Sequence, residues 1–342
     1  MIFNMKKTFL VTGGAGFIGL HLCKRLLKEN FKIVALDNLN PYYSIKLKKA
    51  RIEELYKEGG DFSFIDGDIE NIEFLERIFM EHKPQIVFNL AAQAGVRYSI
   101  SDPIPFLKTN IVGFGNILEV CRKNKIEHLI YASSSSVYGG NKNLPYAEDS
   151  SVDHPVSLYA ATKKSNELMA HTYSHLYSLP STGLRFFTVY GPWGRPDMSY
   201  FLFAKAILEK KSIDIYNYGD MNRDFTYIDD IIESLFRLTN KIPTPDKNFD
   251  AENPSASSSW APHKIFNIGN SNKVKLIDFI NIIEKEIGIK AIKNFLPMQM
   301  GDVHSTLADT SLLEKYINFK PQTSLNFGIK KFIEWYRFFY GK

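Results

Sequence analysis

Short runs of apolar residues alternate with longer amphipathic stretches through the first half of the chain. The apolar runs lie at residues 8–11, 32–36, 62–65, 85–90 and 128–132. Residues 20–29, after the first run, have the three-to-four-residue spacing of a helix. Strands that alternate with helices in this way form a parallel, doubly wound sheet with a ligand crevice at the carboxyl ends of its strands. We therefore predict an α/β fold of this kind.

The second half of the chain shows a less regular pattern. It predicts helices over 201–209, 276–287 and 325–340, and strands over 213–216 and 264–269. The last helix has enough apolar and aromatic positions to anchor a lobe, so we expect packing rather than membrane binding. Between these elements, residues 241–262 are rich in Pro, Ser, Asn and Asp, which is typical of a surface loop.

The composition excludes several classes of protein. Hydrophobic residues make up 44% of the chain, but no run of eighteen apolar residues and no signal-like start occurs, so we expect a cytoplasmic protein without a membrane span. The net charge of +5 comes from 42 basic and 37 acidic residues that are scattered along the chain. This favours an anionic small molecule over nucleic acid. Cys23 and Cys121 lack metal-ligand spacing, and we expect two buried thiols and no metal.

The first apolar run leads directly into a glycine-rich turn, with Gly13, Gly16 and Gly19 at intervals of three residues. Glycines between a strand and a helix let the backbone turn tightly and approach a pyrophosphate, which the helix N-terminus then binds. The spacing is one residue longer at its first interval than the commonest dinucleotide fingerprint. A glycine turn without a ligand is the alternative.

Polar or small residues follow the later strands, where a cofactor would lie. Asp37 ends the second strand, eighteen residues after Gly19, near the place where an acid binds the adenosine ribose. Because a carboxylate repels a 2′-phosphate and no arginine follows at once, NAD is predicted rather than NADP. The fifth strand ends in the run 133–136, four serines that are either a polar turn or hydroxyls facing the crevice.

Tyr159 and Lys163 lie four residues apart in a stretch that reads as a long helix. One helical turn separates them, so both side chains project from the same face. A lysine ammonium beside a phenol favours the phenolate and lowers its pKa. The pair could therefore remove a proton from a sugar or steroid hydroxyl, although the spacing alone also occurs by chance.

These motifs, in this order, resemble the extended short-chain dehydrogenase/reductase family over nearly the whole chain. Within it, the segments 132–140 and 185–198 are most similar to NAD-dependent nucleotide-sugar epimerases, closest to the UDP-glucuronate 4-epimerases. The resemblance implies a Rossmann-type doubly wound sheet, mainly within residues 1–185. It also implies a smaller C-terminal α/β lobe for the nucleotide sugar, mainly within 186–342, with some chain crossing between the two.

The resemblance also implies roles for individual residues. Ser134, Tyr159 and Lys163 would be catalytic, with the choice among Ser134, Ser135 and Ser136 left open. The expected NAD-binding residues are Gly13, Gly16, Phe17, Ile18, Gly19, Asp37, Asn38, Asp68, Ile69, Leu90, Ala91, Ala92, Gln93, Tyr159 and Lys163. The expected substrate-binding residues are Arg97, Ser134, Ser135, Ser136, Thr188, Arg195, Arg223 and Asp302.

Three positions bear on the substrate. Dehydratases and decarboxylases of the family carry an acid where this chain has Ser136, so reversible oxidation at one carbon is the simpler expectation. Arg195 would face the hexose and suits a C5 carboxylate, whereas a neutral sugar would leave its charge poorly compensated. Arg223 would bind the diphosphate. The alternatives are a loop-capping or phosphate-binding Arg195, and an Arg223 paired with Asp220, Asp229 or Asp230.

The resulting hypothesis is a UDP-hexuronate 4-epimerase that converts UDP-glucuronate to UDP-galacturonate. Tyr159 would remove the C4 hydroxyl proton, the C4 hydride would pass to NAD⁺, and the 4-keto sugar would turn over before the hydride returns. The open alternatives are a UDP-glucose 4-epimerase, another nucleotide-sugar oxidoreductase and a non-catalytic NAD-binding protein. Relatives also suggest a homodimer.

Overall fold

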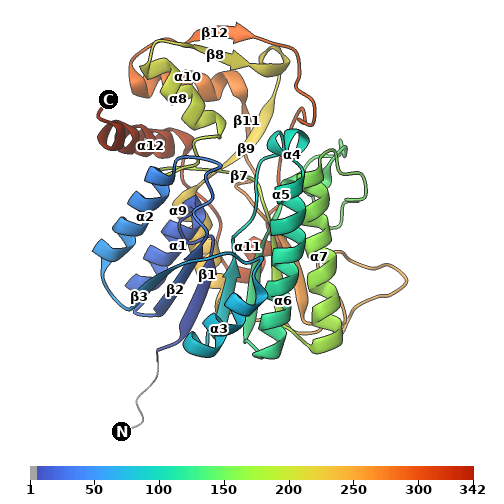
Figure 1. Ribbon diagram of the computed structural model, residues 1–342. Helices are drawn as coiled ribbons and strands as arrows, with labels where there is room; N and C mark the ends of the chain where they lie inside the picture. The colour runs from blue at the N-terminus through green and yellow to red at the C-terminus, as the bar shows by residue number, and fades with distance from the viewer. Residues whose placement is uncertain (1–5) are drawn as a thin grey trace.

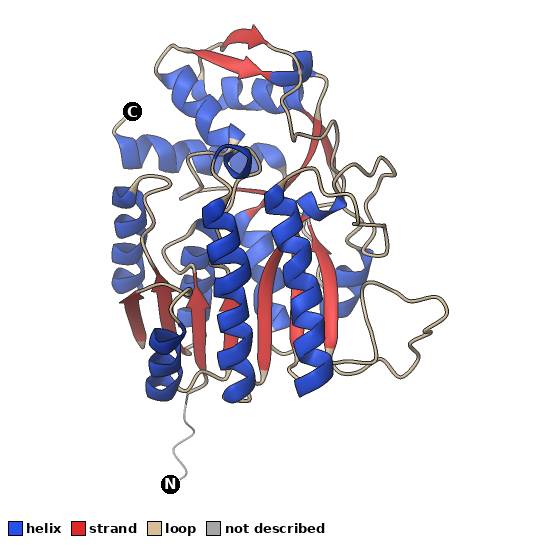
Figure 2. Ribbon diagram, turned by 45° about the vertical axis from the view of Figure 1, so that its right-hand side comes forward, coloured by secondary structure: helices blue, strands red, loops and turns tan. Residues whose placement is uncertain are grey.

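A seven-stranded parallel sheet forms the centre of the protein, for which a computed structural model describes residues 6–342 (Figures 1 and 2). The strand order is β10-β6-β5-β4-β1-β2-β3. The strands span Thr8–Thr12 (β1), Lys32–Asp37 (β2), Phe62–Asp66 (β3), Ile86–Asn89 (β4), His128–Ser134 (β5), Ser181–Phe186 (β6) and His263–Ile268 (β10). From β1 to β3 the strands are added toward one edge of the sheet, and from β4 to β6 they are added toward the other edge. Doubly wound sheets bind ligands at the point between β1 and β4 where this order reverses.

Helices cover both faces of this sheet. On one face lie α1 (Phe17–Lys28), α2 (Ile45–Glu58) and α9 (Ile228–Leu238), whose apolar side chains join the larger core. On the other lie α3 (Ile72–His82), α6 (Phe114–Lys123) and α7 (Leu158–Tyr177), which enclose a separate core (Figure 2). Short helical segments precede α6 and α7: α4 (Tyr98–Ser101), α5 (Ile104–Phe106), η1 (Leu107–Gly113) and η2 (Ser135–Tyr138).

A smaller lobe stands above the carboxyl ends of the sheet (Figure 1). It contains a three-stranded sheet, β11-β9-β7, and a two-stranded sheet, β12-β8. Its strands are β7 (Thr188–Tyr190), β8 (Ser212–Ile215), β9 (Asn222–Tyr227), β11 (Lys273–Lys275) and β12 (Ile292–Phe295). Its helical elements are α8 (Ser199–Leu208), η3 (Tyr216–Gly219), α10 (Leu276–Ile287) and α12 (Leu325–Tyr340), while α11 (Ser311–Ile317) lies against β10 of the main sheet.

The predicted α/β fold class is confirmed, with β10 as the segment that crosses back into the main sheet. The division at residue 185 stays a prediction, because β6 continues through it to Phe186. Cys23 and Cys121 are buried free thiols, as expected. Within residues 6–342 no helix is long and apolar enough to cross a membrane. The expected absence of a signal-like start falls partly on residues 1–5, outside the described residues.

Candidate active site

One cavity of about 640 Å³ lies at the carboxyl ends of the strands, below the smaller lobe. All of the residues predicted for the cofactor, the substrate and catalysis line it. They come from loops after β1, β2, β3, β4 and β5, from α7, and from segments of the smaller lobe. A parallel sheet explains this convergence, since its strands all end at one edge.

The backbone around the glycine turn is packed too closely to admit side chains at Gly13, Gly16 and Gly19. Gly13 has φ +70°, a conformation that favours glycine, and a Cβ there would lie 2.8 Å from the amide nitrogen of Ala91. A Cβ at Gly19 would overlap the Gly13 carbonyl oxygen, so α1 could not pack so closely on the turn. The backbone can therefore come close to a pyrophosphate at the N-terminus of α1, as a bound dinucleotide requires.

Asp37 lies at the end of β2 with its carboxylate buried beside the cavity. It accepts a hydrogen bond from the Leu39 amide at 2.9 Å, and the Lys48 ammonium lies 3.6 Å away. Asn38 donates to Asp68 at 2.8 Å across the neighbouring strand end. A fixed acid at this point suits a ribose diol. Lys48 is a lining residue that sequence reasoning missed, because only the fold brings α2 back to Asp37.

Tyr159 and Lys163 lie on the first turns of α7, whose N-terminus is capped by the Ser157 hydroxyl. Contrary to the expectation from sequence, burial raises the pKa of Tyr159, although the nearby Ser134 hydroxyl and Arg195 oppose this rise. Burial also lowers the pKa of Lys163 to about 8. Lys163 donates to the Ala132 carbonyl oxygen at 2.8 Å, which ties the helix to the end of β5.

The four serines have different partners. The Ser133 hydroxyl donates to the buried Glu167 at 2.7 Å, and Ser133 also belongs to the cavity lining. The Ser134 hydroxyl accepts a hydrogen bond from the Ser136 amide and donates to the Ser136 hydroxyl, both at 3.1 Å. Ser134, Ser135 and Ser136 line the cavity with Tyr159. The nearness of Ser134 to Tyr159 favours it among the three.

Arg195 lies in the cavity wall with its guanidinium paired to Asp197, at 3.0 Å through Nε and 2.5 Å through Nη2. Tyr42 donates to the same carboxylate at 3.2 Å. The argument that a neutral sugar would leave this charge uncompensated was therefore wrong, because the protein itself supplies a partner. Asp197 was missed, although it lies only two residues from Arg195.

Arg97, Arg223 and Asp302 meet at another part of the cavity wall. Asp302 binds Arg223 at 2.7 Å and Arg97 at 3.2 Å. The proposed alternative pairing of Arg223 with Asp220, Asp229 or Asp230 is not found among its contacts. Two arginines that share one carboxylate leave a net positive charge, which suits a diphosphate.

Arg51 joins the cofactor turn to the segment that carries Arg195. Its side chain is fully buried, and it donates to the Ala15 carbonyl at 3.0 Å. It also donates to the carbonyls of Trp193 and Gly194, at 2.6 and 3.1 Å. No local sequence signal indicates this contact, since 142 residues separate Arg51 from Trp193.

The sheet order and the glycine turn together define a Rossmann-type dinucleotide-binding protein, and Tyr159 and Lys163 are the candidate acid–base pair in its cavity. Residues 9–251 match the model of the NAD dependent epimerase/dehydratase family. The chain belongs to this family.

Individual relatives match over almost the full chain. The chain is 52% identical to Protein CapI of Staphylococcus aureus, over 97% of this chain and 99% of that protein. It is 46% identical to a probable UDP-glucuronate 4-epimerase of Rhizobium meliloti, over 96% of each chain. Among solved structures, it is similar to a UDP-glucuronic acid 4-epimerase from Bacillus cereus in complex with UDP-glucuronic acid and NAD. That match has a TM-score of 0.86 and 34% identity, and it covers 97% of this chain and 100% of the other.

Proposed function

We propose that the protein is an NAD-dependent UDP-glucuronate 4-epimerase that interconverts UDP-glucuronate and UDP-galacturonate. The observation that carries this proposal is the position of Arg195 in the same cavity wall as Tyr159, close enough for its charge to affect the phenol. Asp197 binds Nε and Nη2 of Arg195, so a sugar carboxylate near the reacting carbon would be bound through Nη1, which that pair does not use. The relatives from Rhizobium meliloti and Bacillus cereus bear the same activity in their names.

Each end of the substrate has a matching part of the cavity. Arg97 and Arg223 would bind the diphosphate, with Asp302 orienting both guanidinium groups and accepting a ribose hydroxyl. At the other end, Arg195 would bind the C5 carboxylate, with Thr188, Ser135 and Ser136 as polar neighbours in the wall. The sugar would then lie with C4 toward Tyr159.

The chain's own residues handle the proton. The glycine turn and Asp37 would hold NAD, which would supply a reversible acceptor for the C4 hydride. Tyr159, as the phenolate, takes the C4 hydroxyl proton and returns it after the keto sugar has rotated to present its opposite face. Ser134 donates a hydrogen bond to the same oxygen. The Lys163 ammonium, fixed at the Ala132 carbonyl, adds positive charge near the phenolate.

The test is incubation of the purified protein with UDP-glucuronate and with UDP-glucose in parallel, without added NAD and with added NAD, followed by separation of the C4 epimers. UDP-galacturonate should form from UDP-glucuronate, and no net NADH should appear because the cofactor is regenerated. Conversion of UDP-glucose alone would favour the neutral-sugar 4-epimerase instead. Stoichiometric NADH would indicate a net dehydrogenase, and conversion of neither sugar would leave the proposal without support.

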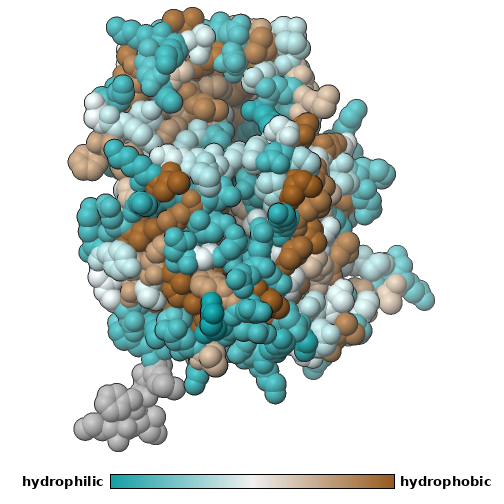
Figure 3. Space-filling model, viewed as in Figure 1, coloured by the Kyte–Doolittle hydropathy of each residue, from teal (hydrophilic) through white to brown (hydrophobic). Residues whose placement is uncertain are grey.

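We also propose that the protein forms a homodimer. Exposed apolar side chains gather over α5, η1 and α7: Ile104, Leu107, Val112, Leu168 and Leu176. Figure 3 shows hydrophobic surface on its right-hand side, where these helices lie. Patches of this kind mark protein contacts. Sedimentation velocity should give twice the chain mass of 39.2 kDa, and Leu168→Glu should give the monomer. The cytoplasmic location and a role in polysaccharide biosynthesis stay predictions.

A further inference from the structure

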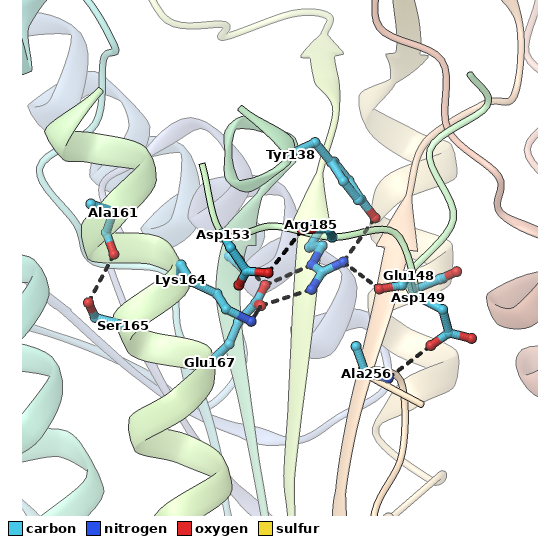
Figure 4. Close-up of polar contacts among 12 residues, drawn as sticks. Tyr138, Glu148, Asp149, Asp153, Ala161, Lys164, Ser165, Glu167, Arg185 and Ala256 are labelled. Atoms are coloured by element: carbon cyan, nitrogen blue, oxygen red, sulfur yellow. Dashed lines mark hydrogen bonds and ion pairs between the residues drawn. The ribbon is translucent and has the colours of Figure 1, made fainter. Parts of the chain in front are cut away.

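Glu167 and Arg185 form a buried ion pair, and neither residue belongs to the cavity lining (Figure 4). Glu167 on α7 and Arg185 on β6 are both almost completely buried. Arg185 donates to the two Glu167 oxygens at 2.8 and 2.9 Å. A buried ion pair is weak evidence for stability, because apolar side chains of similar volume often stabilise a core as well or better. Its presence here calls for another explanation.

The pair holds both ends of the loop that carries Ser134, Ser135 and Ser136. At the first end, Ser133 donates to Glu167 Oε1 at 2.7 Å. At the other end, Arg185 donates to the Tyr138 hydroxyl at 3.0 Å. The loop between them is the short turn η2, so fixing its two ends fixes the hydroxyl groups that line the cavity.

The same pair also fixes the helix that carries the acid–base group. Tyr159, Lys163 and Glu167 follow at four-residue intervals along one face of α7. Lys163 contacts the Ala132 carbonyl and Glu167 contacts the next residue, so two adjacent bonds join α7 to the end of β5. The helix and the end of β5 are thus held to one another one and two helical turns beyond Tyr159.

Further bonds complete this network. Arg185 also donates to the Glu148 carbonyl at 2.9 Å (Figure 4). Tyr138 donates to Asn267 at 2.6 Å. Lys164 lies 3.7 Å from Glu167. Among the described residues, some buried side-chain nitrogen and oxygen atoms lack a hydrogen-bond partner, but none of them belongs to this network. A fully satisfied polar network specifies one arrangement of its elements.

We propose that Glu167 and Arg185 are positioning residues that set the distance between the serine loop and Tyr159 during proton transfer. This inference rests on the proposed function, since it assigns the pair to that reaction. Reacting groups must be held closely, and a misplacement of about 1 Å can reduce the rate by about 10²-fold. Removing a bond of the network should therefore lower kcat more than it changes KM.

The test uses Ser133→Ala, which removes one hydroxyl and leaves the ion pair in place. Its control is Ser174→Ala, because Ser174 is a buried serine of the same helix that donates to the Leu179 carbonyl at 2.7 Å, far along α7 from Tyr159. Ser133→Ala should lower kcat for UDP-glucuronate by about tenfold with little change in KM, whereas Ser174→Ala should keep wild-type kcat. Ser133→Thr keeps the hydroxyl and should recover most of the rate.

A second readout does not depend on the substrate. Amide hydrogen exchange of residues 134–139 should be faster in Ser133→Ala than in the wild type, and unchanged in Ser174→Ala. If either kcat or the loop exchange of Ser133→Ala equals that of Ser174→Ala, the proposal is overturned. If the wild type converts no sugar, the proposed function fails separately, and the exchange comparison alone decides whether Glu167 and Arg185 hold the loop.

Discussion

Tyr159 needs to lose a proton to act as a base, yet its buried position opposes this change. Burial raises the pKa of the phenol, because a phenolate is poorly solvated there. Burial likewise lowers the pKa of Lys163 to about 8. The cation whose charge opposes this rise is Arg195 in the cavity wall, while the Lys163 ammonium on the same helix face is bound to the Ala132 carbonyl. The base strength of Tyr159 is therefore a property of the assembled site.

Tyr159→Phe should abolish most of the turnover while leaving ligand binding intact. The substitution removes only the hydroxyl, and loss of a general acid–base group typically costs about 10²–10⁴-fold in rate. Steady-state epimerisation of UDP-glucuronate gives kcat, and calorimetric titration with UDP gives the affinity. Turnover within tenfold of the wild type would show that another group is the base.

Arg195→Ala should weaken the use of UDP-glucuronate selectively. A charge-assisted bidentate pair is worth about 1.5–3 kcal/mol, so kcat/KM for this sugar should fall by about 10- to 100-fold. The value for UDP-glucose should change little. Because the variant leaves Asp197 without its partner, the double variant with Asp197→Ala is the control. Equal losses for both sugars in both variants would assign Arg195 to general binding instead.

At the scale of elements, we expect the choice between NAD and NADP to depend on the contact between the end of β2 and helix α2. The Asp37 carboxylate ends β2, and the Lys48 ammonium of α2 lies 3.6 Å away. An acid excludes a 2′-phosphate by repulsion, whereas a cation at the same point would attract it. We therefore expect the preference for NAD over NADP to depend on whether the negative charge of Asp37 or the positive charge of Lys48 dominates at this point.

Asp37→Asn should reduce discrimination between NAD and NADP by at least about tenfold, because it removes the repulsive charge and frees Lys48. Binding titrations with both cofactors, monitored by protein fluorescence, give the ratio of affinities. In the double variant Asp37→Asn with Lys48→Gln, the gain in NADP affinity relative to NAD should disappear. An unchanged ratio in Asp37→Asn would contradict the placement of the ribose at Asp37.

At the scale of the whole molecule, one buried carboxyl makes stability depend on pH. Burial raises the pKa of Glu148 to about 7, although the Asn267 amide donates to it. The folded protein then binds a proton that the unfolded chain releases near pH 4.5. Since the folded state holds this proton over the range, the contribution of Glu148 to stability should fall as the pH rises from about 4.5 to about 7.

Glu148→Gln should remove the part of the pH dependence that Glu148 contributes, while Asp224, whose pKa burial raises to about 6, keeps its own contribution. Glutamine resembles the protonated acid and keeps an oxygen for the Asn267 amide. The variant should be about 1–3 kcal/mol more stable than the wild type at pH 8 and similar to it at pH 5, as measured by urea unfolding. Glu119→Gln is the control, and its effect on stability at pH 8 should have the opposite sign. Hydrogen bonding from Arg122 lowers the pKa of Glu119, so the charged carboxylate stabilises the fold and its loss should destabilise it. Equal unfolding midpoints of Glu148→Gln and wild type at pH 8 would refute the assignment.

The sequence predicted the strand-end residues of the site well, for a physical reason. A parallel sheet brings all of its carboxyl ends to one edge, so Gly13, Asp37 and Ser134 could be placed together without knowing any long-range contact. Helix spacing likewise placed Tyr159 beside Lys163. Periodicity gave α10 and α12 with the bounds that the structure has.

Side-chain partners from distant segments could not be predicted in the same way. Lys48 and Arg51 depend on how α2 packs, and the pairing of Arg223 with Asp302 spans 79 residues. The direction of the Tyr159 pKa shift depends on burial, which a spacing rule does not report. The charge balance at Arg195 was misjudged because a neighbouring acid in the sequence was not recognised as its partner.

The contacts of Arg51 with the Trp193–Gly194 segment bear on how sugar preference could change in evolution. Arg51 binds only backbone carbonyls there, and it binds the cofactor turn at the same time. Side chains at positions such as Arg195 and Asp197 can therefore be exchanged while these carbonyls stay in place. An insertion or deletion would move the carbonyls away from a buried guanidinium. New substrates are thus more accessible to this scaffold by point substitution in a loop of constant length than by remodelling the loop.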